Sequence, residues 1–194
     1  RQAAAIGLAQ ALATAEAFRP YPALLDRAAW AEVPEAQRKA FVAEAERQLG
    51  TEWAVLPATR FLDYVRDGNR GRYEKLLFSR RGKLADLVLG ELLEGRGRFM
   101  DAIADGLWLI CEESYWGVPA HVGAQKRGSG LPDVTEPTVD LFAAETSALL
   151  AWTVDSHWGK PKIATSPNDA HGDLAAIGDQ HPIERHARLL LLFF

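Results

Sequence analysis

Apolar residues recur along most of this chain at the three- and four-residue spacing of amphipathic helices, and few stretches alternate in the way that strands do. The pattern predicts a helix over residues 2–18, ended by Pro20 and Pro22. A second helix is predicted over residues 34–49, with a proline in its first turn and Gly50 as its stop. Its apolar stripe consists of Phe41, Ala45 and Leu49.

Three further helices are predicted in the middle of the chain. They cover residues 57–68, residues 72–94 with Gly95 as the stop, and a segment that begins near Phe99. The last has two adjacent apolar rows, so we expect an inner helix that is buried over a wide face. The rows are Phe99, Ile103, Leu107 and Ile110, and Met100, Ala104, Trp108 and Cys111.

Helical periodicity disappears between Tyr115 and Pro137 and returns over residues 138–152. Successive helices with short turns predict an all-α fold of antiparallel helical hairpins over residues 1–152. Residues 153–194 form an atypical tail without periodicity, with four of the five histidines and a possible short helix over residues 182–194. We expect this tail to be poorly ordered.

Length and charge narrow the class of protein only moderately. A chain of 194 residues fits one domain with its own core. A net charge of −4 does not indicate binding to nucleic acid, and no apolar run has the length of a membrane span, so we expect neither partner. The chain begins without Met, and the sequence therefore leaves the compartment open between cytoplasmic and exported.

The familiar cofactor and metal motifs are absent or incomplete. The glycine-rich stretch at residues 123–130 has Ser129 where a phosphate-binding loop needs lysine. His181 and His186 are five positions apart, which turns them away from each other on a helix, and a single cysteine cannot form a thiolate zinc site. We therefore expect no metal and no cofactor.

A basic cluster allows two interpretations. Its arginines could bind an anionic polymer, because a guanidinium pairs well with carboxylate and sulfate groups. Alternatively, the cluster is a solvated helix surface, which we favour. It consists of Arg80, Arg81, Lys83, Arg96 and Arg98.

The stretch ICEESYWGVPAH, residues 110–121, has the composition of a functional site. Glu113 lies where a helix ends, and a carboxylate at a helix C-terminus is electrostatically disfavoured. Tyr115, Trp116 and His121 supply a phenol, a flat apolar ring suited to a sugar, and an imidazole that can exchange protons. In the purely structural interpretation, the tryptophan fills the core and the polar groups bond the loop.

Three runs in the chain carry a resemblance to a known family. They are TEWAVLPATRFLDYVRDGNRGRYE, LWLICEESYWGVPAH and GLPDVTEPTVDLFAAETSALLAW. They resemble the N-terminal helical region of bacterial heparinase II/III-like proteins, and the similarity covers residues 18–152. From Thr153 onward the sequence departs from the family pattern, which continues with further helices and a β-sandwich domain.

The resemblance implies a partial (α/α) toroid and β-elimination of an anionic, uronic-acid-containing polysaccharide. It suggests Tyr115 as base or acid, and His121 as base or as the group that neutralises the substrate carboxylate. Trp116 would stack on the sugar, and Glu113 would orient one of the two. The remaining candidates for contact with substrate are Gln125, Lys126, Asp133 and Glu136, and residues of the missing β-sandwich domain would complete the site.

Two other functions remain open from the sequence. Helical toroids also carry glycoside hydrolases, and Glu113, Asp133 and Glu136 could provide an acid and base pair. The chain could instead be a non-catalytic, glycan-binding fragment. Fold analogy alone does not decide among the three.

Overall fold

A computed structural model describes residues 21–158. This part is predominantly helical and contains no strand, which confirms the predicted all-α class. The helix expected at residues 2–18 and the tail from residue 159 onward lie outside the described residues. Within them, no helix is both long and apolar enough to cross a membrane.

Six α-helices and one short 3₁₀ helix make up the described part. Their bounds are α2 Arg27–Ala31, α3 Glu35–Leu49, α4 Ala58–Asp67, α5 Gly71–Glu94, α6 Met100–Cys111, η1 Pro119–Ala124 and α7 Leu141–Trp158.

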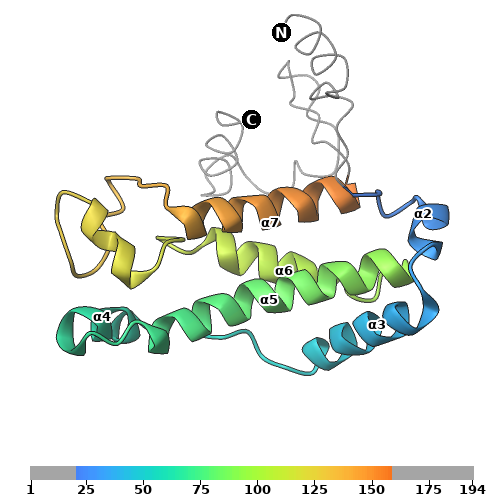
Figure 1. Cartoon of the computed structure of the whole chain (residues 1–194), viewed down its shortest axis with the longest axis horizontal. Coiled ribbons are helices and arrows are strands. Elements are labelled where there is room, and N and C mark those ends of the chain that lie inside the picture. Colours follow the sequence, from blue (N-terminus) through green and yellow to red (C-terminus); the bar gives the residue numbers. More distant parts are fainter. Residues whose placement is uncertain (1–20, 159–194) are drawn as a thin grey trace, which may run out of the picture.

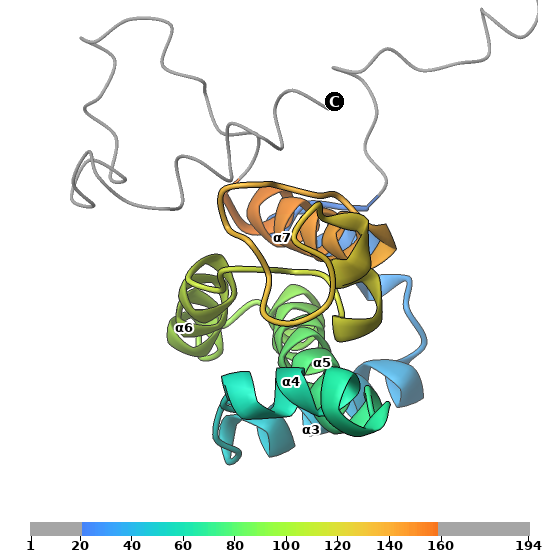
Figure 2. The ribbon, with the colours of Figure 1, turned by 90° about the vertical axis from the view of Figure 1, so that its left-hand side faces the viewer.

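Helix α5 is the centre of the arrangement. It contacts α3, α4, α6 and α7, and the end view in Figure 2 places it between α7 on one side and α3 and α4 on the other. The side view in Figure 1 shows α3 and α6 antiparallel to α5, and α7 antiparallel to α6. This up-and-down order agrees with the expected helical hairpins, since short connections place successive helices antiparallel.

Prolines and glycines set the helix ends at the predicted positions. Pro34 and Pro57 occupy the N-cap positions of α3 and α4. Gly68 and Gly95 follow α4 and α5 with φ of 76° and 70°, the left-handed conformation that a glycine adopts without a Cβ clash.

The packing of α3 on α5 corrects the predicted stripe of α3. Ala45 is fully buried, whereas Phe41 and Leu49 are 43% and 41% exposed. The contact depends on Gly90 of α5, because a Cβ at that position would lie 2.3 Å from the Ala45 Cβ. Two small residues therefore bring the helices close together, and the larger apolar groups of α3 lie beside the contact.

The expected inner helix is also corrected. Phe99, Ile103 and Ile110 are fully buried, but Ala104 of the second predicted row is exposed. In the described bundle α6 packs chiefly on α5, and Figure 2 shows it at the side of the bundle. A helix with one main neighbour buries one row of side chains.

Helix α7 begins and ends later than predicted. Residues 138–140 precede it, and the helix continues past residue 152 to Trp158, with Thr153 and Ser156 buried. The predicted boundary between helical portion and tail therefore falls inside α7. The alternation of apolar and polar positions weakens after Trp152 because these buried positions are small hydroxyl residues whose side chains bond carbonyls one turn earlier.

Candidate functional site

Residues 112–140, here called the connecting segment, join α6 to α7 and contain every predicted site residue. Val118 and Val122 anchor the segment in a small core with Phe61, Tyr73 and Leu77. This core fixes η1 against α4 and α5. The segment is therefore an ordered part of the fold with its own apolar anchor.

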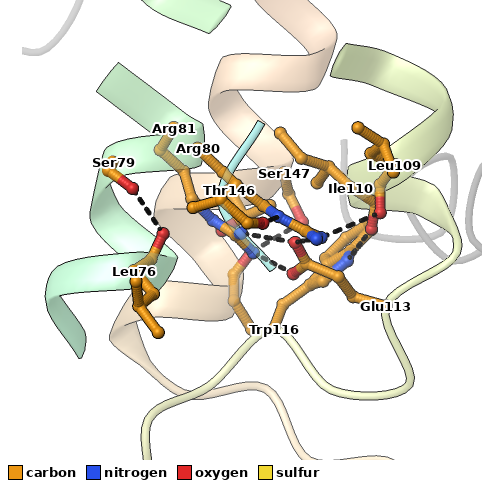
Figure 3. A network of polar contacts seen from close by, with 12 residues as sticks. Leu76, Ser79, Arg80, Arg81, Leu109, Ile110, Glu113, Trp116, Thr146 and Ser147 are labelled. Carbon is orange, nitrogen blue, oxygen red and sulfur yellow. Dashed lines mark hydrogen bonds and ion pairs between the residues drawn. The ribbon is translucent and has the colours of Figure 1, made fainter. Parts of the chain in front are cut away.

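Glu113 forms the strongest set of polar contacts in this region. Arg81 approaches it with two nitrogens, at 2.7 Å from Oε1 and 2.6 Å from Oε2, and Arg80 Nη1 lies 3.0 Å from Oε1 (Figure 3). The Glu113 side chain is only 6% exposed, and those of the arginines are 10% and 12% exposed. A bidentate, shielded carboxylate of this kind is held firmly.

The two arginines bond other elements as well. Arg80 Nε donates to the carbonyl of Ala54 at 2.6 Å, and Arg81 Nε donates to the Thr146 hydroxyl of α7 at 3.2 Å. Glu113 therefore closes a network that connects α5, α6 and α7. No contact joins it to Tyr115 or His121 within the described residues, although the resemblance gave it the role of orienting one of them.

The rest of the predicted basic cluster is also compensated. Lys83 donates to the carbonyl of Thr51 and lies over the Trp53 ring. Arg98 pairs with Glu94 and Glu46, and Arg96 pairs with Glu94. Intramolecular partners thus take up these cations, and they do not form an uncompensated basic surface.

Trp116 packs partly against the main core, which includes Ile103 and Ile110. Its indole N–H donates to the carbonyl of Ile110 at 2.8 Å, one of the last carbonyls of α6 (Figure 3). This placement agrees with the structural interpretation of the residue. Any stacking on a sugar would use only the remaining exposed part of the ring.

Tyr115 is half-buried and its hydroxyl is enclosed. The ring packs edge-on against Phe61, with centroids 6.1 Å apart, and folds back over Gly117, where a Cβ would lie 2.6 Å from the hydroxyl. The hydroxyl has no hydrogen-bond partner of ordinary distance and angle among the described residues, and neither has that of Thr138.

The surroundings of Tyr115 favour the protonated phenol. Burial raises the pKa of Tyr115, and the Asp140 charge adds to the rise, while the nearby Thr138 hydroxyl acts in the opposite direction. Because a raised pKa keeps the proton on oxygen, Tyr115 is better suited to donate a proton than to remove one.

His121, in η1, is held by residues at the start of α7. Its Nδ1 lies 2.6 Å from Asp140 Oδ2, and its ring stacks on Phe142 with centroids 5.4 Å apart and an interplanar angle of 26°. The His121 side chain is 38% exposed. No partner of its Nε2 occurs among residues 21–158, so one nitrogen is available for chemistry.

The four remaining candidates form a separate set of contacts. Gln125 is 3% exposed and donates to the carbonyls of Asp133 and Glu136 at 2.9 and 2.7 Å, while its Oε1 accepts from the Asp133 amide. Glu136 accepts from the backbone N–H of Lys126 at 2.8 Å. Gln125 thus joins the two ends of the loop over residues 125–136, and its side-chain amide is already hydrogen-bonded to backbone groups.

Asp133 has a local partner of its own. Its carboxylate accepts from the hydroxyl and the amide of Thr135, and these bonds hold its pKa below the ordinary value. A carboxyl group in this state is ionised near neutral pH and is a poor proton donor.

A shallow cavity lies between α5 and α7, close to the histidine. Its volume is about 100 Å³, well below the roughly 300–1,000 Å³ of typical small-molecule sites. Phe142, the ring on which His121 stacks, contributes to its wall. The lining residues are Leu77, Phe78, Arg81, Phe142, Glu145, Thr146 and Leu149.

The structure brings two of the predicted residues to a third that the sequence analysis missed. Asp140 contacts His121 directly, and its charge acts on Tyr115. The signal was present in the sequence, since an aspartate directly before an apolar helical run is a typical N-cap. It was overlooked because the predicted helix began at residue 138, three residues too early, which placed Asp140 inside the helix. No cluster of three or more potential metal ligands occurs within residues 21–158.

Comparison with known protein families and with curated proteins finds no family model and no curated protein that match this sequence.

Proposed function

We propose that this chain is part of a helical-toroid polysaccharide lyase that cleaves uronic-acid-containing polysaccharides by β-elimination. In this proposal His121 is the base and Tyr115 is the acid. The observation that carries it is the contact of His121 with the carboxylate of Asp140, whose charge also acts on Tyr115. The resemblance to heparinase II/III-like proteins supplies the reaction class and the toroid, of which the bundle around α5 would be one portion.

The state of each group supports its role. A carboxylate on Nδ1 leaves the Nε2 of His121 as the position that can accept a proton. Tyr115 has a raised pKa, which favours a phenol that still carries its proton. A phenol that carries its proton and an imidazole nitrogen that can accept one are the two kinds of group that proton-transfer catalysis needs.

The proposed β-elimination uses His121 and Tyr115 for its two proton transfers. His121 Nε2 takes the proton from the carbon that bears the uronate carboxylate, and the electron pair of that C–H bond forms a carbon–carbon double bond. The bond to the neighbouring glycosidic oxygen breaks, and the Tyr115 hydroxyl gives that oxygen a proton. With His121 as the base, the carboxylate must be neutralised by a further donor.

In this structure a polysaccharide has no direct access to the Tyr115 hydroxyl. The Tyr115 hydroxyl is enclosed, and the nearby cavity of about 100 Å³ is too small for a sugar ring. The proposal therefore requires the part of the connecting segment around Gly117 to open when substrate binds. Catalytic groups are often covered by such loops.

The hydrolase alternative has less support. Glu113 is bound by two guanidinium groups and offers no free oxygen to a sugar, and Asp133 has a lowered pKa that is unsuited to a general acid. A glycan-binding fragment without catalysis is the remaining outcome, and the experiment below distinguishes it.

The test is the ultraviolet absorbance of the unsaturated uronate product, with the purified chain and a panel of uronate-containing polysaccharides. We expect a rise with the wild-type chain that Tyr115→Phe and His121→Ala each reduce at least about a hundredfold. Tyr64→Phe removes a hydroxyl from α4 that has no role in the proposed reaction, and should leave the rate unchanged.

Each other outcome excludes part of the proposal. New reducing ends without absorbance would indicate a hydrolase. Binding without either product would indicate a glycan-binding fragment. Equal activity in wild type and in the two site variants would show that the assigned residues are wrong.

A further inference from the structure

Asp140 makes two different hydrogen bonds with its two carboxylate oxygens. Oδ1 accepts from the amide of Ala143 at 2.7 Å, which is the N-cap contact of α7, and Oδ2 lies 2.6 Å from His121 Nδ1. The Asp140 side chain is only 13% exposed. One largely shielded carboxylate therefore connects the first turn of α7 to the imidazole.

The first turn of α7 also sets the plane of that ring. Phe142, two residues after Asp140, stacks on His121 with ring centroids 5.4 Å apart, and it also contacts Phe78 of α5, with ring centroids 5.2 Å apart. The carboxylate fixes the direction of Nδ1, and the aromatic ring fixes the rotation of the imidazole about that direction. Both constraints come from the same helix end.

An ionised carboxylate can only accept a hydrogen bond, so Nδ1 must carry the proton in this contact. In a neutral imidazole the other nitrogen, Nε2, then holds the lone pair. Nε2 has no hydrogen-bond partner within the described part of the chain. The geometry thus selects one of the two neutral tautomers.

We propose that Asp140 is a positioning residue for His121, which holds the imidazole as the Nδ1–H tautomer and leaves Nε2 as the proton acceptor. The catalytic meaning of this assignment rests on the proposed lyase function. The tautomer itself does not, because it follows from the contact between the two side chains.

A competing explanation is that Asp140 serves only to cap α7. The two roles need different chemistry and can be separated by substitution. Asn and Ser both cap helices well, so Asp140→Asn and Asp140→Ser should preserve α7. The amide of an asparagine can donate to Nδ1, which would favour the Nε2–H tautomer, and a serine hydroxyl lacks the negative charge that selects Nδ1–H.

The test is long-range proton–nitrogen NMR of the full chain with ¹⁵N-labelled histidine, near pH 8.5, where imidazoles of ordinary pKa are neutral. His121→Gln assigns the signals by loss, since the chain has five histidines. We expect Nδ1–H in the wild-type chain and a switch toward Nε2–H in Asp140→Asn, with unchanged far-ultraviolet circular dichroism. An Nε2–H tautomer of His121 in the wild-type chain would overturn the proposal. So would a His121 tautomer that stays the same in both Asp140 variants.

The same variants separate this inference from the lyase function. If the wild-type chain is active, Asp140→Asn should lower kcat by about 10²–10⁴-fold with little change in KM, as expected for loss of general base catalysis. If the wild-type chain shows no elimination but the tautomer switches as described, the lyase function fails and the positioning role of Asp140 stands.

Discussion

Glu113, just beyond the end of α6, and Arg81, in the middle of α5, form a bidentate ion pair with nitrogen–oxygen distances of 2.7 and 2.6 Å. The pair explains why a carboxylate lies at a helix C-terminus, where the helix dipole disfavours it. A negative charge at a helix C-terminus is destabilised by about 0.3–1 kcal/mol. Buried, charge-assisted hydrogen bonds stabilise it by more than that. Glu113 is thus held by α5, and its main role in this structure is to join helices.

Glu113→Gln should destabilise the fold. The substitution leaves Arg80 and Arg81 without a counter-charge in a region where their side chains are 10% and 12% exposed. Breaking a buried pair by removing one partner costs about 3–5 kcal/mol. Urea unfolding followed by circular dichroism measures the loss as a lower midpoint.

The neighbouring Glu112→Gln is the matched control. Glu112 is exposed and has no ion pair within the described residues. Its free energy of unfolding should change by less than about 0.5 kcal/mol. Equal effects of the two substitutions would mean that the ion pair with the arginines does not stabilise the chain.

Gly90→Ala should weaken the contact between α3 and α5. The new Cβ would lie 2.3 Å from the Ala45 Cβ, and neither helix can avoid it without moving. Overpacking of this kind costs about 1–3 kcal/mol. Gly82→Ala on the same helix has open space around it and should instead stabilise by about 0.4–1 kcal/mol. Thermal unfolding of both variants would show shifts of opposite sign, and two stabilising shifts would contradict the close approach.

Cys111 should react slowly with alkylating reagents in the folded chain. Burial, with a smaller effect of the Glu113 charge, raises the pKa of its thiol to about 11. At pH 8 the thiolate fraction then falls roughly a hundredfold below that of an ordinary cysteine. Mass spectrometry of iodoacetamide adducts, with and without urea, reports on this single cysteine. Rapid labelling without urea would show that the thiol is accessible and unshifted.

Gln125→Ala should loosen the connecting segment. Three backbone groups of Asp133 and Glu136 lose their partner, and a buried polar group left unpaired costs about 1–3 kcal/mol. Hydrogen exchange at the Asp133 amide should become faster. In Lys126→Ala the backbone N–H bond to Glu136 is kept, so exchange should stay at the wild-type rate. Similar exchange in all three proteins would mean that Gln125 does not close the loop.

Local patterns predicted the helices well where proline and glycine mark the ends. The helices around Pro34, Pro57, Gly68 and Gly95 all follow from backbone geometry, which is a property of a residue and its immediate neighbours. Burial was predicted less well. Phe41, Leu49 and Ala104 fit an apolar period yet remain exposed, because burial depends on which helices lie beside each face.

The candidate site divides in the same way. The sequence by itself determined that a phenol, an indole, an imidazole and several carboxylates gather in one irregular stretch between two helices. The tertiary structure decided their partners: Glu113 belongs to Arg80 and Arg81, whereas the carboxylate on His121 is Asp140, 19 positions away along the chain. Contacts between residues so far apart in sequence depend on how the helices pack, and no local spacing encodes that packing.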